Sequence, residues 1–486
     1  MFSLLPALLL LAGPQGDLET QMKRFIDVFA LVEEHAADPV SLDQAFYQGA
    51  LPGLLRRLDP HSVFFDPGNF EQLKQLQTST QKGFGTVVSV LPGRVIVLQT
   101  LPGTPSERSG ISPGDEIVGI NNIPLAALDM DQLIALLSQS RQQQVQLYVR
   151  RPGNARLLEF VLTPEEMQSP SVERAFLLEP GFAYIRVTSF DANTPEELRG
   201  AIENLGGASL KGLVLDLRNN TGGVMGAALE TASFFLKPGQ KIVSVRGRKV
   251  ETQDIDVPAG PAAYEFPLAV LINEKSASGS EIVAGALQDH DRAVILGEPS
   301  FGKGLVQSVY PLSEGTGVAL TTAFYYTPSG RSIQRPLAVG QLGEALGAAA
   351  RAPAEYRTDS GRLVTGGGGI EPDITVFPDA TTRLRMVLDV SGAFAHFATE
   401  VLRRQDLHVT AAFEVTPRLL DQFQAFLSRN NIRPGLAEWS RDLAWTRSRL
   451  HQEIFNQALG VEKGDEIEAR RDPVVRRAVD ELERRP

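Results

Sequence analysis

Residues 269–289 read AVLINEKSASGSEIVAGALQD, and this segment indicates the fold class most directly. Its first four residues form an apolar run that predicts a strand ending near Asn273, and the SASGS segment at 276–280 predicts a tight turn. The apolar positions that follow have helical spacing. Further strands are predicted at 182–187, 212–217, 293–297 and 318–326, with helices between them. Such alternation of strands and helices predicts an α/β layer.

The hydroxyl of Ser278 lies at the turn–helix junction of this segment. Backbone N–H groups in the first turn of a helix lack intrahelical partners and favour negative charge. An acyl-transfer nucleophile benefits from such donors, because the developing oxyanion needs preorganised hydrogen bonds. The alternative is structural, since Ser278 and Glu281 also fit a capping box. This segment alone favours neither role, and Ser276 and Ser280 are competing candidates.

Lys303 is the candidate general base. It lies between two glycines in residues 301–307, FGKGLVQ, at the start of an apolar strand. Burial favours the neutral amine, which can take a proton from a serine hydroxyl and return it to a leaving group. Gln307 would lie on the same strand face, but an extended strand would hold the two Cα atoms roughly 13 Å apart. A bend at Gly304 would be needed for Gln307 to orient the amine. Gly304 also occupies the position where a phosphate-binding P-loop requires Ser or Thr, which excludes that motif.

Residues 213–223, LVLDLRNNTGG, are a third informative segment. A predicted strand ends in a polar turn with two glycines, and glycine lets backbone N–H groups approach a ligand closely. Gly222 or Gly223 could therefore supply an oxyanion donor beside that of Gly279. The alternative is an ordinary turn in which Asp216 and Arg218 form a structural pair.

The sequence divides into five predicted parts. Residues 1–16 contain an apolar run at 4–12 that is too short for a membrane span and is typical of an export signal, although no Lys or Arg precedes it. Residues 17–75 are predicted to be helical, 76–165 to form a small β-rich module, 166–380 to form the α/β core and 381–486 to form a helical domain. The last part could be a dimerisation arm, an adaptor surface or a cap on the core, and an apolar stripe near the end favours self-association through the C-terminal helices. The residues of the stripe are Val475, Ala478, Val479 and Leu482.

Composition narrows the function classes. The 486 residues include no cysteine, which excludes disulfides, thiol catalysis and cysteine-based zinc sites. The six histidines show no metal-ligand spacing, so we expect no metal. We predict no other cofactor. A formal charge of −11 argues against nucleic acid as a partner.

Six ordered motifs resemble those of the C-terminal processing proteases of peptidase family S41. They are LDPHS at 58–62, LDLRNN at 215–220, SASGSE at 276–281, GEPSFGKG at 297–304, YTPSGRSIQ at 326–334 and GIEPD at 369–373. The resemblance extends from about residue 20 to residue 380 and leaves the C-terminal segment outside it. It implies a crotonase/ClpP-like protease core with an inserted PDZ domain, and the helical pattern of 381–486 adds a helical C-terminal extension.

The resemblance also implies catalytic roles. Ser278 would be the nucleophile, Lys303 the general base and Gln307 the residue that orients it. Oxyanion donors would come from Gly279 and from the turn at 222–223. The family uses no histidine base, so His61 and His290 are expected to be structural.

The PDZ domain would capture substrates that end in exposed apolar C-termini. Its carboxylate-binding loop would be Gly83, Phe84, Gly85 and Thr86, with Leu133 and Leu137 shaping an apolar pocket. The peptide would add as a strand beside 86–90. Peptide binding could also gate the catalytic site. A periplasmic location follows from the export signal, with membrane anchoring left open, and an adaptor protein would be a further partner.

Two rival functions remain at this stage. The first is a non-catalytic PDZ chaperone or adaptor that keeps the protease fold, and the presence of Ser278, Lys303 and Gln307 argues against it. The second is a crotonase-like acyl-CoA enzyme, but the sequence contains nothing that resembles a CoA-binding segment.

Overall fold

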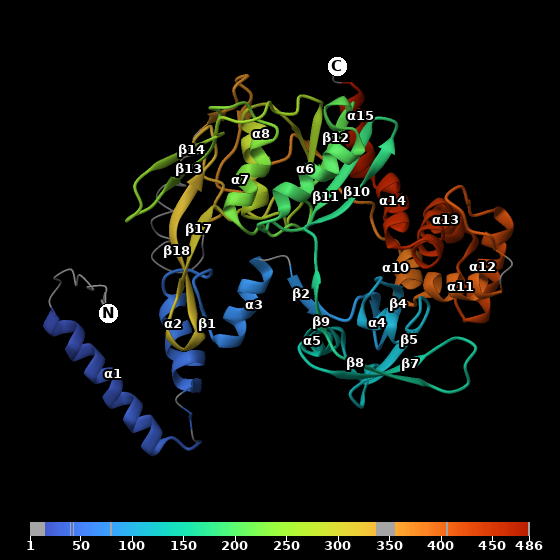
Figure 1. Ribbon diagram of the computed structural model, residues 1–486, viewed down its shortest axis with the longest axis horizontal. Coiled ribbons are helices and arrows are strands. Elements are labelled where there is room, and N and C mark those ends of the chain that lie inside the picture. Colours follow the sequence, from blue (N-terminus) through green and yellow to red (C-terminus); the bar gives the residue numbers. More distant parts are fainter. Residues whose placement is uncertain are drawn as a thin grey trace. The chain divides into compact units, whose positions relative to one another are not determined.

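The computed structural model describes residues 15–38, 40–41, 43–77, 80–336, 355–404 and 407–484 (Figure 1). These residues form two compact units. The N-terminal unit contains the described residues up to 70 together with 307–321, and the main unit contains 71–306, 322–336 and those from 355 onward. The apolar run at 4–12, on which the predicted export signal depends, lies outside the described residues.

The N-terminal unit is mainly helical. It contains α1 (Gln15–His35), a π-helix η1 (Gln44–Ala50), α2 (Leu51–Arg56) and the start of α3 (Pro67–Gln77). Strand β1 (Val63–Phe65) pairs antiparallel with the first part of β18 (Gly317–Tyr326), which also pairs with β17 (Leu305–Pro311). A short helix η4 (Ser313–Gly315) lies between these two strands. The LDPHS motif forms the turn before β1, because the Asp59 carboxylate accepts the N–H groups of His61 and Ser62 at 2.7 and 2.8 Å.

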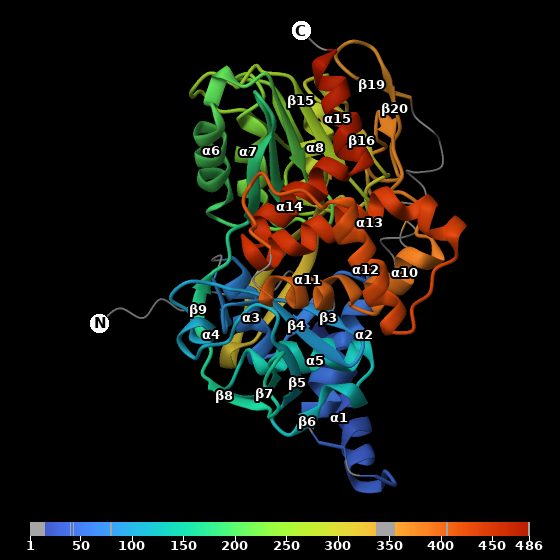
Figure 2. The ribbon, with the colours of Figure 1, turned by 90° about the vertical axis from the view of Figure 1, so that its right-hand side faces the viewer.

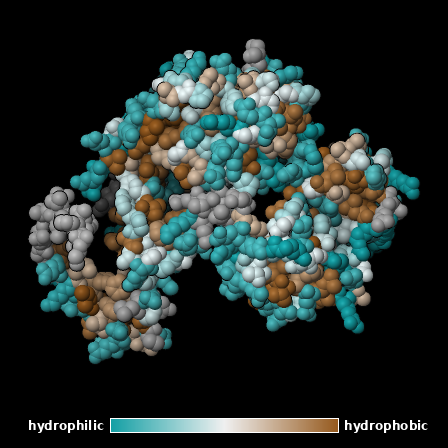
Figure 3. Space-filling view, viewed as in Figure 1, coloured by the Kyte–Doolittle hydropathy of each residue, from teal (hydrophilic) through white to brown (hydrophobic). Residues whose placement is uncertain are grey.

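Helix α1 is largely exposed. Phe25 and Phe29 contact the ring of Phe46, with centroid distances of 5.7 and 5.5 Å. The other large apolar side chains of α1 that stay more than a third exposed are Leu18, Met22, Ile26, Val28, Leu31 and Val32. Figure 3 shows hydrophobic surface at the lower left, in the part of the view where Figure 1 labels α1 and α2. The helical spacing of α1 therefore predicts the helix correctly but not a buried face.

Residues 80–168 form a β-rich module within the main unit. Its sheet has the order β3 (Thr86–Leu91), β4 (Arg94–Thr100), β5 (Glu116–Ile120), β7 (Val145–Arg150) and β8 (Leu158–Leu162), and β6 (Ile123–Pro124) pairs with β5. The short helices α4 (Pro105–Arg108) and η2 (Leu125–Ala127) lie between strands. Strands β2 (Thr80–Gly83) and β9 (Glu165–Gln168) pair where the chain enters and leaves the module.

Helix α5 (Met130–Ser140) packs on this sheet. Its predicted capping box is confirmed, since the Gln132 N–H donates to Asp129 at 2.8 Å and the Asp129 N–H donates to Gln132 at 3.1 Å. An acceptor at each end of this first turn satisfies N–H groups that the helix itself cannot pair.

The core of the main unit is a six-stranded sheet. Its order is β10 (Val172–Glu179), β11 (Phe182–Val187), β12 (Gly212–Asp216), β15 (Leu268–Ile272), β16 (Val294–Gly297) and β21 (Ile374–Thr375). Neighbours from β11 to β21 are parallel, and only β10 runs antiparallel to its neighbour. This arrangement confirms the predicted α/β class.

Beside this sheet, β13 (Lys241–Arg246) pairs with β14 (Gln253–Asp256) and with the second part of β18. A small hairpin is formed by β19 (Tyr356–Arg357) and β20 (Leu363–Val364).

Helices cover both faces of the six-stranded sheet. On one face lie α6 (Thr194–Leu205), α7 (Met225–Ser233) and α8 (Gly279–Asp289), with η3 (Gly207–Ser209) following α6. The other face packs against α15 (Pro473–Glu483), as Figure 2 shows.

This packing corrects the predicted role of the C-terminal stripe and agrees with the alternative of a cap on the core. The apolar stripe of α15, Val475, Ala478, Val479 and Leu482, is buried against the chain's own sheet. It is therefore unavailable for the self-association that the stripe was expected to support. A helical apolar stripe shows only that one face is covered, and here the sheet covers it.

Five more helices connect the core to α15. They are α10 (Arg383–Val390), α11 (Ala393–Arg403), α12 (Pro417–Arg429), α13 (Leu436–Ala458) and α14 (Val461–Arg471), which follow one another in the chain. They contact the β-rich module at β4, where Arg94 donates to the Ser391 carbonyl and Gln99 accepts the Val461 N–H at 2.9 Å. Among the described helices, none has both the length and the hydropathy that a membrane crossing requires.

Candidate active site

Ser278 lies between β15 and α8 in a backbone conformation that residues other than glycine rarely adopt. Its φ is 55° and its ψ is −111°. Such strain costs on the order of 1–3 kcal/mol and is concentrated at functional sites. Ser278 begins α8 with half of the predicted capping box: the Glu281 carboxylate accepts the Ser278 N–H at 2.8 Å, whereas the Ser278 hydroxyl accepts no capping hydrogen bond.

The two competing serines have structural partners. The Ser276 hydroxyl donates to the Leu217 carbonyl at 2.8 Å, and the Ser280 hydroxyl donates to the Asn220 carbonyl at 2.9 Å. Both side chains are fully buried, whereas Ser278 is half-buried. Of the three, Ser278 is therefore the serine best placed to react with an external substrate.

Glu281 joins the backbone at Ser278 to the backbone at Lys303. Its carboxylate is fully buried and accepts from the Ser278 N–H at 2.8 Å and the Lys303 N–H at 2.9 Å. It also accepts from the Gly302 N–H at 2.7 Å and the Ser300 hydroxyl at 2.6 Å. Burial raises the pKa of Glu281, and these four donors act against that increase.

Tyr325 makes a second link between the same two positions. Its buried hydroxyl donates to the carbonyl of Ser278 at 3.0 Å and also contacts the carbonyl of Lys303. Burial, together with the charge of Glu281, raises the pKa of Tyr325 well above its ordinary value, so the phenol stays a donor. The backbones at 278 and 303 are thus fixed by two buried side chains, one at their N–H groups and one at their carbonyls.

Lys303 and Gln307 lie in different units of the structure. Lys303 is half-buried in the main unit, directly before β17. Gln307 lies on β17 in the N-terminal unit, where its side-chain amide donates to the His61 carbonyl at 2.6 Å. The structure therefore unites the backbones of Ser278 and Lys303 and shows Gln307 with a backbone partner.

The turn after β12 packs directly on the turn before α8. The buried carbonyl of Asn220 accepts from the Ala277 N–H at 2.9 Å and from the Ser280 hydroxyl. Gly222 has a φ of 97°, and a Cβ at this position would lie 2.7 Å from the Cβ of Ser278. No side chain larger than hydrogen fits there without a shift.

The two glycines of this turn differ in their hydrogen bonding. The Gly222 N–H donates to the side chain of Asn220 at 2.8 Å. It is therefore already engaged, which leaves Gly223 as the better donor candidate of the pair. The Gly279 N–H belongs to the first turn of α8, where helix geometry provides no intrahelical acceptor.

Asp216 and Arg218 form the structural pair that the sequence allowed. The guanidinium donates to both oxygens of Asp216, with a shortest distance of 2.6 Å, and Tyr184 donates to the same carboxylate at 2.7 Å. Burial alone would raise the pKa of Asp216, but the neighbouring Arg218 lowers it below its ordinary value. The pair thus fixes the end of β12 at the point where the glycine turn begins.

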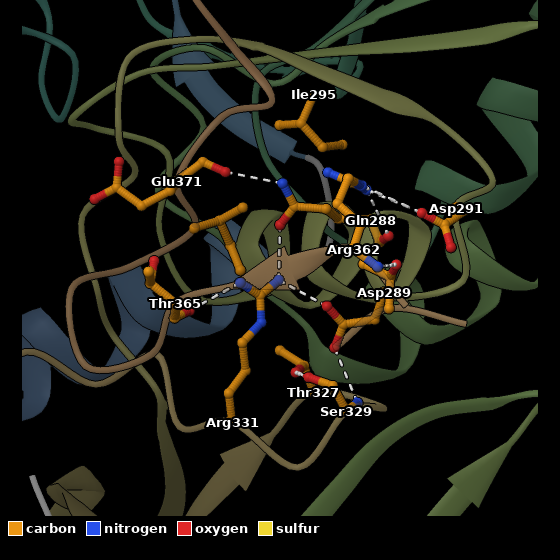
Figure 4. A network of polar contacts seen from close by, with 12 residues as sticks. Gln288, Asp289, Asp291, Ile295, Thr327, Ser329, Arg331, Arg362, Thr365 and Glu371 are labelled. Carbon is orange, nitrogen blue, oxygen red and sulfur yellow. Dashed lines mark hydrogen bonds and ion pairs between the residues drawn. The ribbon is translucent and has the colours of Figure 1, made fainter. Parts of the chain in front are cut away.

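A buried polar network holds the far end of α8 (Figure 4). Arg331 is fully buried and donates to Gln288 and to Asp289, each at 2.7 Å. Arg362 reaches the same helix end through Asp291 and the Gln288 carbonyl. These contacts explain Arg331, the single charged residue of the YTPSGRSIQ motif at 326–334, because it anchors the helix that begins at Ser278.

The histidines expected to be structural have backbone or carboxylate partners. Nε2 of His290 lies 2.7 Å from the Lys241 carbonyl, and its Nδ1 lies 2.8 Å from Asp359. His61 takes part in the Asp59 turn through its own N–H.

The β-rich module contains a cavity of about 290 Å³ between β3 and α5. Its lining includes the predicted loop residues Gly83, Phe84, Gly85 and Thr86. Leu137 also lines it, whereas Leu133 is fully buried in the core of the module. The sequence did not indicate Lys82, Arg141 and Met167, which line the same cavity.

Comparisons with known proteins identify the families of the α/β core and of the β-rich module. The model of peptidase family S41 matches residues 181–340, and that of the PDZ domain matches residues 96–151. A carboxy-terminal-processing protease of Bartonella bacilliformis is 36% identical over 322 residues, which are 65% of this chain and 73% of that protein. The chain belongs to peptidase family S41. The resemblance predicted from the six motifs is confirmed, and so is the PDZ domain.

Two further proteins are also similar to this chain. A carboxyl-terminal-processing protease of Synechocystis is 34% identical over 311 residues, covering 63% of this chain and 72% of that protein. The solved structure of a photosystem II D1 C-terminal processing protease is 26% identical and covers 75% of this chain and 94% of its own, with a TM-score of 0.40.

Proposed function

We propose that this S41 chain is a serine endopeptidase that captures substrate C-termini and cleaves through a Ser278–Lys303 dyad. The observation that carries the proposal is the double link between the two backbones, through Glu281 at the N–H groups and Tyr325 at the carbonyls. The strained backbone of Ser278 supports it further.

In the proposed reaction, the neutral amine of Lys303 takes the proton of the Ser278 hydroxyl as the oxygen attacks the scissile carbonyl. The N–H groups of Gly279 and Gly223 would stabilise the oxyanion. The ammonium then returns the proton to the leaving amine, which departs and leaves an acyl-enzyme. Water, deprotonated by the same amine, hydrolyses the ester and restores the hydroxyl. Gln307 would orient the amine, as the family resemblance implies.

The PDZ domain would select the substrate. A terminal carboxylate would bind the loop at 83–86, the peptide would extend beside β3, and the last side chain would enter the cavity lined by Phe84 and Leu137. The cations Lys82 and Arg141 line the same cavity and favour a negatively charged terminus. Gating of the dyad by bound peptide, a crotonase/ClpP-like core, export to the periplasm and an adaptor partner are further parts of this proposal.

Cleavage of an unstructured polypeptide with an apolar C-terminus tests the dyad. We expect S278A and K303A each to lower kcat at least about 1,000-fold, because both steps need the two groups together. K275A is the matched control for K303A. Lys275 is an exposed lysine in the turn that carries Ser278, and its variant should cleave like the parent. Parent-like cleavage by S278A or K303A would refute the dyad. Binding of the polypeptide without cleavage by the parent would favour the chaperone function instead.

A further inference from the structure

Arg218 has a second acidic partner outside the family core. Its Nη1 donates to Oδ2 of Asp472 at 2.7 Å, while its Nε and Nη2 donate to Asp216. Asp472 lies between α14 and α15, beyond the residues that the family model matches. Both side chains of this ion pair are largely buried, with 18% of Arg218 and 21% of Asp472 exposed.

The two carboxylate oxygens of Asp472 accept hydrogen bonds from different parts of the chain. Oδ1 accepts the N–H groups of Val474 and Val475 at 2.8 and 3.3 Å, which caps α15. Oδ2 remains for Arg218. One carboxylate therefore joins the helix that covers the second face of the sheet to the end of β12. A cap alone would require only an acceptor oxygen, whereas the contact with Arg218 uses the negative charge.

The contact has a short path to the candidate oxyanion donor. Arg218 begins the turn that continues through Asn220 to Gly223, and its own N–H donates to Asp216 at 2.9 Å. Asn220 in turn holds the Ser278 turn through the Ala277 N–H. Asp216 holds the Nε–Nη2 edge of the guanidinium through both of its oxygens, and Asp472 holds Nη1, which Asp216 does not contact, so the two carboxylates together restrain Arg218 from two sides.

We propose that Asp472 is a positioning residue for the turn at 218–223. It acts through Arg218 and sets where the Gly223 N–H lies relative to Ser278. This proposal rests on the proposed protease function. It also assigns the C-terminal segment a role within the catalytic core instead of a role in assembly.

The test uses D472N in the full-length chain, with D480N as control. Asparagine keeps a capping oxygen for α15 but loses the charge, and Asp480 is an exposed carboxylate on the same helix. We expect D472N to lower kcat about tenfold with KM within about twofold, because the oxyanion contact is made only in the transition state. D480N should match the parent, and D472E should recover part of the lost kcat.

Hydrogen exchange supplies a readout that does not depend on activity. The amides at 219–223 should exchange faster in D472N than in D480N, while those of α8 should be unchanged. Equal kcat and equal exchange in the two variants would overturn the proposal. So would a D472N chain in which α8 and the turn loosen together, because that result indicates a general loss of stability. If the parent itself does not cleave, the proposed function fails, and the exchange comparison still tests the positioning.

Discussion

At the scale of single residues, the carboxylate of Glu281 controls the candidate site. It has four donors from two segments and is fully buried. A protonated carboxyl could not accept from all four donors without placing its own proton against one of them. The ionised form therefore gives the geometry described here, although burial raises the pKa of Glu281.

Burial favours the protonated form of Glu281, whereas its four donors need the ionised form. We therefore expect stability and activity to depend on pH in opposite directions. The pKa of Glu281 in the folded chain lies above its ordinary value of 4.5, so the folded state binds more protons than the unfolded state between the two values. Its contribution to stability is full below the ordinary pKa and is lost as the pH rises through the folded one. Activity should rise over the same range, as the carboxylate ionises.

E281Q should remove both dependences and lower stability by about 1–3 kcal/mol, because its amide N–H groups face other donors. Denaturant titrations and kcat profiles across the acidic range measure the two effects. Parallel profiles for parent and variant would contradict this account.

At the scale of elements, the turn after β12 and the turn before α8 act as one piece. Their contact depends on Gly222, whose α-hydrogen faces Ser278. The Gly222 position tolerates no added side chain, because backbone atoms of Ala277 and Gly279 lie directly against it.

G222A should therefore lower kcat at least about 100-fold and stability by about 1–3 kcal/mol, through both strain and displacement of Ser278. The control is G226A in α7, where a Cβ meets nothing within 4 Å and the backbone is helical. It should be neutral or slightly stabilising, as alanine favours helix over glycine. Thermal unfolding and peptide cleavage of both variants decide the matter, and a fully active G222A chain would exclude the proposed contact.

At the scale of the whole molecule, the proposed function places substrate recognition and cleavage in different domains. L137A should raise KM about tenfold with little change in kcat, because a truncated pocket loses about 1–2 kcal/mol of apolar burial. I134A is its control on the same helix, since Ile134 is 51% exposed. An amidated substrate C-terminus should weaken binding similarly. If KM were unchanged both for L137A and for the amidated substrate, the PDZ domain would not be the part that captures the substrate.

Local patterns predicted much of the architecture. The apolar run and helical spacing at 269–289 gave β15 and α8, and the capping box of α5 was visible in four residues. The partners of Glu281 were not predictable, because three of its donors lie about 20 positions away and meet it only in the folded chain. Asp472 is 254 positions from Arg218, and no local pattern joins them. The stripe of α15 was recognised, but a sequence does not say which surface covers it.

The placement of α15 has a consequence for how the chain is made. One face of the central sheet exposes Phe176, Phe182 and Leu271 until residues 474–482 have left the ribosome and can cover them. Every strand of that sheet is synthesised earlier, so a growing chain carries this uncovered apolar surface until α15 has emerged. We expect nascent chains that stop before α15 to bind a holdase or to aggregate, and chains extended past Leu482 to resist protease. A ribosome-arrested series of lengths would locate that transition.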